Sequence, residues 1–124
     1  MAPDAARAGR SLDMLRSKRD FGALQGASRS RAHPLLLVRF RRNDLGHDRY
    51  GISTSRRLGK AVLRNQVRRR IREALRRMDR TPGVGWDILV VARPASATAS
   101  YQDLRTALER LVAPFRTTEE TRQT

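Results

Sequence analysis

The chain has 124 residues, of which 27 are lysine or arginine and 12 are aspartate or glutamate, giving a formal net charge of +15. This length allows one domain with a modest core. The absence of cysteine excludes disulfides, cysteine zinc sites and thiol catalysis. Apolar runs such as residues 35–38 are far too short to span a membrane. So many like charges repel one another in a folded protein. Binding to phosphates relieves this repulsion and releases their counterions, so nucleic acid is the expected partner.

The N-terminal region is predicted to contain one short helix. Residues 1–12 are rich in alanine and arginine without an apolar stretch, so we expect a disordered basic N-terminus rather than a secretory signal. Ser17 and Asp20 have the spacing of a helix start, where a serine and an acid three residues later cap free amides. A loop rich in glycine, serine and arginine follows over residues 26–34 and could include a short strand.

Two strands are predicted around a hairpin. Residues 35–41 and 49–55 are the strands, and the turn residues of 43–48 separate them. The later part of the first strand alternates, which places Leu37 and Arg39 on one face and Val38 and Phe40 on the other.

The second half of the chain is predicted to be helix, strand and helix. The longest helix covers residues 60–78. Residues 86–92 are almost all apolar, as in a central strand. Ser100 has the capping spacing again and opens a helix with apolar residues at helical intervals as far as residue 115. The polar residues 116–124 are predicted to be a disordered tail.

This order of elements predicts a single α+β domain over residues 13–115, built as an α/β sandwich with helices packed on a small sheet. If the strands on either side of the long helix are parallel, the general rule for such connections predicts a right-handed crossover.

The long helix and the strand before it carry most of the charge. Residues 49–77 contain 11 basic residues and one acid, Glu73. At 100° per residue, Val67, Ile71, Ala74, Leu75 and Met78 form an apolar stripe with Leu63. The adjacent side, which we call the arginine face, begins at Arg64, and residues four apart on it are about 6 Å apart along the axis, near the phosphate spacing of an extended strand. The arginine face consists of Arg64, Asn65, Arg68, Arg69, Arg72 and Arg76.

The start of this helix also favours an anion. A first helical turn prefers acids, because its free amides carry partial positive charge, yet Lys60 and Arg64 occupy it. A phosphate or carboxylate bound there by the backbone amides and by Lys60, Arg64, Arg56 and Arg57 would relieve this conflict. The alternative, a solvated basic face, is less favoured with one acid among eleven bases.

No spacing in the chain suggests a protein active site. Asp44, His47 and Asp48 fall together in the hairpin, where a polar turn is favoured over a metal or general-base site. No nucleophile with its base and no pair of acids poised for hydrolysis is evident elsewhere. A protein of this kind is expected to bind a nucleic acid rather than to cleave it alone.

Residues 51–75 closely resemble the signature of the bacterial ribonuclease P protein family. The motif is a Gly-x-Ser-x-Ser strand, a basic pair, a glycine, and then Arg-Asn-x-x-(Lys/Arg)-Arg-x-x-Arg, which begins here at Arg64 and Asn65. The resemblance covers roughly residues 15–112. It implies an exceptional left-handed crossover around the long helix, against the general expectation.

The resemblance also implies a function and a site. The protein would bind the catalytic RNA of ribonuclease P and the 5′ leader of precursor tRNA, as a monomer in a 1:1 cytoplasmic ribonucleoprotein that does not bind membranes. The RNA would perform the hydrolysis with bound Mg²⁺, so the protein is an enzyme subunit without catalytic or metal-binding residues of its own. The implied RNA-binding residues are Arg56, Arg57, Lys60, Arg64, Asn65, Arg68, Arg69, Arg72 and Arg76, and the implied leader cleft has Phe21, Gln25, Val38, Phe40, Ser53 and Ser55.

Three positions depart from the family pattern: Gln66 replaces an arginine, and Gln25 and Val38 replace aromatics. The leader cleft is therefore expected to have fewer stacking platforms, each worth about 1–3 kcal/mol per base. Two other classes of function stay open at this point, a structural RNA-binding protein of ribosomal type and a stand-alone nuclease.

Overall fold

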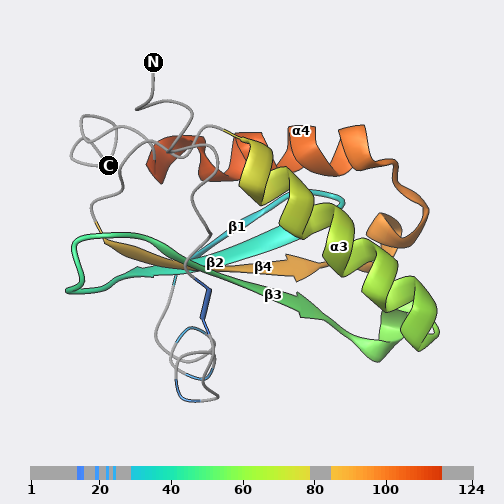
Figure 1. Cartoon of the computed structure of the whole chain (residues 1–124), viewed down its shortest axis with the longest axis horizontal. Coiled ribbons are helices and arrows are strands. Elements are labelled where there is room, and N and C mark those ends of the chain that lie inside the picture. The colour runs from blue at the N-terminus through green and yellow to red at the C-terminus, as the bar shows by residue number, and fades with distance from the viewer. Residues whose placement is uncertain are drawn as a thin grey trace.

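The computed structural model describes residues 14–15, 19, 22, 24, 29–78 and 85–115. A four-stranded sheet lies at its centre (Figure 1), with the spatial order β1-β2-β4-β3. β4 is antiparallel to β2 and parallel to β3, so the sheet is mixed. The strands are β1 (Arg29–Ala32), β2 (Leu36–Arg42), β3 (Arg49–Thr54) and β4 (Trp86–Ala92).

Two helices, α3 (Ala61–Arg77) and α4 (Tyr101–Val112), lie on the same side of this sheet (Figure 1). Within the described part of the chain, no helix has the length and apolarity needed to cross a bilayer. Short 3-10 segments adjoin the helices: η1 (Arg56–Leu58) precedes α3, η2 (Pro94–Thr98) precedes α4, and η3 (Ala113–Phe115) follows α4. The predicted α+β architecture is confirmed.

The connection from β3 through α3 to β4 is left-handed (Figure 1). The family resemblance predicted this hand correctly, and the general right-handed expectation was wrong. The two faces of β2 differ. One face carries Leu36, Val38 and Phe40, which are buried, and the other carries Arg39 and Arg41. The apolar stripe of α3 is buried on the first face, so the helix crosses on that side of the sheet.

The main core lies between this face and the two helices. The predicted stripe of α3 is buried there, with Val67, Ile71 and Leu75 fully inaccessible to solvent. Each such side chain contributes about 1.5–3 kcal/mol through burial. The stripe fixes the rotation of α3, and the arginine face must therefore point away from the core. The α4 residues that share this core with the apolar stripe of α3 are Leu104, Ala107, Leu108, Leu111 and Val112.

A second, smaller cluster lies on the opposite face of the sheet. Leu15 and Leu24 are buried there against Leu89 of β4, and Val91 packs against them. The Leu15 amide donates a hydrogen bond to the Tyr50 carbonyl of β3 at 2.7 Å. Leu15 and Leu24 therefore cover part of the face that the helices leave open.

The predicted strands and the long helix are confirmed to within a residue or two where the structure describes them, and α4 ends at Val112 and continues to residue 115 as η3. The predicted hairpin is wrong, because β4 lies between β2 and β3, which do not pair with each other. β4 has the predicted bounds, and the Ser100 hydroxyl accepts from the Asp103 amide at 3.0 Å to cap α4. Arg19 and Gly22 have helical backbone within the predicted first helix, most of which lies outside the described residues. The predicted disordered segments, 1–12 and 116–124, lie outside them too. The possible strand within the early loop exists as β1.

Candidate nucleic-acid interface

The chain enters α3 through a tight turn. The Gly59 amide donates to the Arg56 carbonyl at 3.1 Å, which closes η1. Gly59 has φ +130°, and a Cβ there would lie 3.0 Å from Cδ2 of Leu63, so only glycine fits without strain. This turn brings Arg56, Arg57 and Lys60, all exposed, next to the first turn of the helix.

The predicted conflict at the helix start is confirmed. Lys60 is the N-cap of α3, but its side chain makes no capping hydrogen bond, and the first turn contains no acid. The first amides of the helix are therefore left without the side-chain acceptor that usually satisfies one of them. An anion bound beside Lys60 would supply that acceptor.

Replacing Lys60 by aspartate is expected to increase the free energy of unfolding by about 0.5–2 kcal/mol, because an aspartate at this position caps the helix. The same change is expected to weaken RNA binding, because it exchanges a positive charge for a negative one. Urea unfolding and RNA titration measure the two effects. Lys60→Asn is the control: it adds a cap while removing a single charge, and it should weaken binding less than Lys60→Asp.

The arginine face lies open to solvent along α3. Asn65, Arg69, Arg72 and Arg76 are exposed. Because α3 is anchored to the core through its apolar stripe, these groups are held in a row with the periodicity of the helix. Such a row can contact successive phosphates of a nucleic acid strand.

The two remaining residues of the face, Arg64 and Arg68, are half-buried. Nη2 of Arg68 donates to Oγ1 of Thr54, at the end of β3, over 2.7 Å. The Nε of Arg64 is buried and has no hydrogen-bond partner among the described residues. The beginning of the arginine face therefore lies against the folded domain, next to the end of β3.

Other arginines of α3 have structural partners. Nη1 of Arg70 donates to the Ala99 carbonyl just before α4, at 3.2 Å. Arg77 binds the Glu73 carboxylate, and this hydrogen bond lowers the pKa of Glu73. Nη1 of Arg76 is 3.7 Å from Oε1 of the same carboxylate. Glu73 thus partly neutralises the C-terminal end of the arginine face, and the positive charge is greatest toward the start of the helix.

Two of the predicted leader-cleft residues are core residues. Val38 has no exposed surface, and Phe40 is 8% exposed and packs edge-to-face on Trp86 with ring centroids 5.6 Å apart. Neither side chain can contact a nucleotide, so these two assignments are wrong. They fail because strand alternation turns both toward the helices. The departure from the family pattern at Val38 therefore has no bearing on stacking.

The other four predicted cleft residues are only partly described. Ser53 is half-buried and pairs with Val91, which places it on the face opposite the helices. Ser55 is exposed at the start of η1. Phe21 and Gln25 lie outside the described residues. Leu37, Arg39 and Arg41 of β2 lie on the same face as Ser53. Leu37 and Arg39 were predicted to share one face of the strand, but they were not assigned to the cleft.

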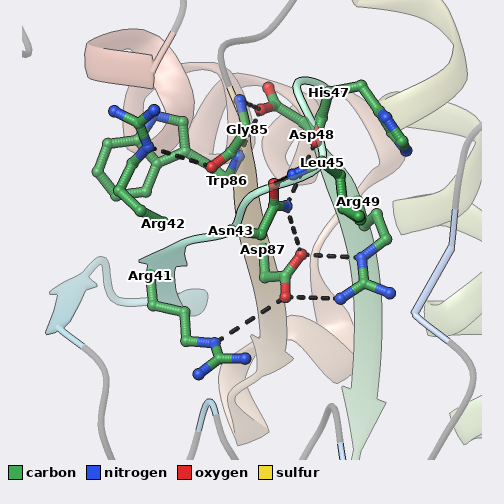
Figure 2. Close-up of polar contacts among 10 residues, drawn as sticks. All are labelled: Arg41, Arg42, Asn43, Leu45, His47, Asp48, Arg49, Gly85, Trp86 and Asp87. Carbon is green, nitrogen blue, oxygen red and sulfur yellow. Dashed lines mark hydrogen bonds and ion pairs between the residues drawn. The ribbon is translucent and has the colours of Figure 1, made fainter.

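A buried ion cluster that was not predicted from the sequence lies at the end of this face (Figure 2). Asp87 of β4 has no exposed surface. Nε and Nη2 of Arg49, in β3, donate hydrogen bonds to its carboxylate at 2.9 and 2.8 Å. Nδ2 of Asn43 donates a third at 2.8 Å. Nε of Arg41 lies 4.0 Å away. A single acid within an otherwise apolar strand was the available signal, because such a group requires partners when it is buried.

This cluster keeps Asp87 ionised. Burial alone would raise the pKa of the carboxyl, but hydrogen bonds from Arg49 and Asn43 and the charges of Arg49 and Arg41 outweigh it, so the pKa lies below its usual 3.8. The cluster joins the end of β2, the loop after it, and the starts of β3 and β4. It therefore fixes the strand register beneath the proposed binding surfaces.

One acid of the loop between β2 and β3 has a structural role. Asp48 accepts from the amides of Gly85 and Trp86 at 3.2 and 2.8 Å, and burial raises its pKa in spite of these bonds. Gly85 has φ +115°, and a Cβ there would lie 2.9 Å from Oδ1 of Asn43, so this close approach requires glycine. Among the described residues, no group of three or more acidic or histidine side chains could hold a metal ion.

A small α+β domain with a row of exposed arginines on an anchored helix belongs to the class of nucleic-acid-binding proteins. Comparison with known proteins gives the family. The family model described as Ribonuclease P matches residues 10–116, so the chain belongs to the ribonuclease P protein family.

Individual relatives agree with this assignment. A ribonuclease P protein component of Clostridioides difficile is 35% identical over 99 residues, which cover 79% of this chain and 87% of the relative. The structure of the Staphylococcus aureus RNase P protein matches with a TM-score of 0.76 at 28% identity, over 86% of this chain and 100% of the other. The RNase P protein from Thermotoga maritima matches with a TM-score of 0.71 at 31% identity, over 80% and 94% of the two chains.

Proposed function

We propose that this chain is the protein subunit of ribonuclease P, which binds the catalytic RNA and the 5′ leader of precursor tRNA and assists the RNA in removing that leader. The observation that carries the proposal is the exposed arginine face on an anchored helix, in a chain of this family. The row of guanidinium groups would neutralise phosphates of the folded RNA and release their counterions. The protein would act as a monomer in a 1:1 cytoplasmic complex.

The sheet face opposite the helices is the candidate surface for the leader. It carries the half-buried Arg39 and Ser53 beside the apolar Leu37 and Val91. Single-stranded RNA is bound in this way, with cations along the backbone and apolar side chains against the bases. This surface replaces the predicted one that relied on Val38 and Phe40.

Hydrolysis is assigned to the RNA partner with its Mg²⁺. The described residues offer no cluster of ligands for a protein-bound metal, so no Mg²⁺ site is proposed on the protein. The contribution of its side chains is to bind and to neutralise charge. With less repulsion between phosphates, the RNA would need less Mg²⁺ to hold its folded structure.

Reconstitution with a bacterial ribonuclease P RNA tests this function. The protein is expected to permit cleavage of precursor tRNA at low Mg²⁺ and to raise the affinity for precursor over mature tRNA. A structural RNA-binding protein of ribosomal type would bind RNA without this preference. A stand-alone nuclease would cut precursor tRNA in the absence of the RNA. Either result would contradict the proposal.

Replacing Arg68 by alanine is expected to lower the slope of log affinity against log salt concentration by about one unit, because one phosphate contact is lost. Titration of the catalytic RNA at several salt concentrations measures the slope. Arg105→Ala is the matched control, since this arginine of α4 is already paired with Glu109 at 3.1 Å. An unchanged slope for Arg68→Ala would remove Arg68 from the interface.

A further inference from the structure

We propose that Thr54 is a positioning residue for RNA binding, whose hydroxyl holds the guanidinium of Arg68 in its binding orientation without neutralising its charge. This inference rests on the proposed function, because it assigns Arg68 to the RNA interface. It concerns a residue of β3 outside the arginine face.

The geometry places Thr54 where it can act on this one arginine. Thr54 is the last residue of β3 and pairs with Ala92, so its side chain lies on the helix-covered face of the sheet. Its Oγ1 accepts from Nη2 of Arg68 at 2.7 Å, across 14 residues of sequence. η1 and the turn at Gly59 set the position of α3 relative to β3, so both partners of this bond are on anchored elements.

The acceptor of Arg68 differs from the acceptors of the other paired arginines. Arg49, Arg77 and Arg105 bind carboxylates, which cancel their charge. Arg31 and Arg70 donate to backbone carbonyls of Leu111 and Ala99, which turns them toward the fold. The threonine hydroxyl is neutral and occupies one of the five N–H donors of Arg68. The full positive charge and the other donors stay available to a phosphate.

Holding the side chain in advance strengthens binding because an arginine loses rotamer freedom when it becomes fixed in an interface. The cost of immobilising one long side chain corresponds to about a 2- to 12-fold change in affinity. If the Thr54 hydroxyl has already fixed Arg68 in the free protein, part of this cost has been met before the RNA arrives. Removing the hydroxyl should therefore weaken binding by a factor in this range.

The test compares Thr54→Val, which removes the hydroxyl and keeps the shape, with Thr54→Ser, which keeps the hydroxyl. Thr106→Val, at an exposed position of α4, is the matched control. Each variant is checked for wild-type thermal unfolding and titrated with a bacterial ribonuclease P RNA, alone and combined with Arg68→Ala. We expect Thr54→Val to bind about 2- to 12-fold more weakly, and Thr54→Ser and Thr106→Val to bind like the wild type. Thr54→Val should have no further effect once Arg68 is alanine.

Two results would overturn the inference, and they differ in what they say of the proposed function. If Arg68→Ala weakens binding and Thr54→Val does not, Thr54 has no positioning role and the proposed function stands. If Arg68→Ala binds like the wild type, Arg68 is not at the interface and Thr54 has nothing to position. The cleavage assay with the wild-type protein then decides the function independently.

Discussion

Replacing Asp87 by alanine is expected to lower the free energy of unfolding by about 3–5 kcal/mol, a large part of the stability of a domain of this size. Asp87 is fully buried and accepts two hydrogen bonds from Arg49 and one from Asn43. Without the carboxylate, Arg49 loses the two hydrogen bonds and the ion pair that it makes with Asp87 inside the fold. Urea unfolding followed by circular dichroism measures the change.

A graded control and the pH dependence identify the cause. Asn43→Ala is expected to cost about 1–2 kcal/mol, because it removes one of the hydrogen bonds to the Asp87 carboxylate and leaves the ion pair in place. The lowered pKa of Asp87 means that its contribution is complete above its usual value of 3.8 and is lost as the pH falls through the folded-state value. The stability difference between the wild type and Asp87→Ala should therefore shrink below pH 3.8. A difference that stays constant with pH would contradict this account.

Replacing Arg68, Arg69 and Arg72 together by glutamine is expected to weaken binding to the catalytic RNA by about 100- to 500-fold at 0.1 M salt. Each lost phosphate contact lowers the slope of log affinity against log salt by about 0.7–0.9, so three contacts lower it by about 2–3. Glutamine is a good helix former, so α3 should be preserved. Equilibrium titration across a series of salt concentrations gives the slope and the affinity together.

The control removes the same amount of charge elsewhere. Arg77, Arg105 and Arg110 can be changed together to glutamine, and the first two of these are already paired with Glu73 and Glu109. This variant is expected to keep a slope close to that of the wild type. If both triple variants lose affinity equally, net charge determines binding and the arginine face has no special role.

The sequence predicted α3 and its two sides well, because helical periodicity alone separates Val67, Ile71 and Leu75 from Arg69 and Arg72. No contact with another element is needed to see which side is core. The bounds of β4 were predicted for a similar reason, because a nearly continuous run of apolar residues is typical of a strand in the middle of a sheet.

The leader cleft was not predictable in the same way. Alternation along β2 showed that Val38 and Arg39 lie on opposite faces, but local sequence does not say which face the helices cover. That choice depends on the hand of the crossover, which is a property of the whole fold. The partners of Asp87 were hidden for a related reason: Arg49 is 38 residues away in the chain, and only the pairing of β3 with β4 brings the two together.

The position of β4 has a consequence for how the protein is made. β4 lies between β2 and β3, so the first strands translated cannot complete the sheet by themselves. A nascent chain that ends before residue 86 can form the β1–β2 hairpin, while β3 has no β4 to pair with and the apolar stripe of α3 lacks much of its cover. Completion of the sheet must wait until residues 86–92 have left the ribosome, and until then a strongly cationic helix is exposed beside ribosomal RNA.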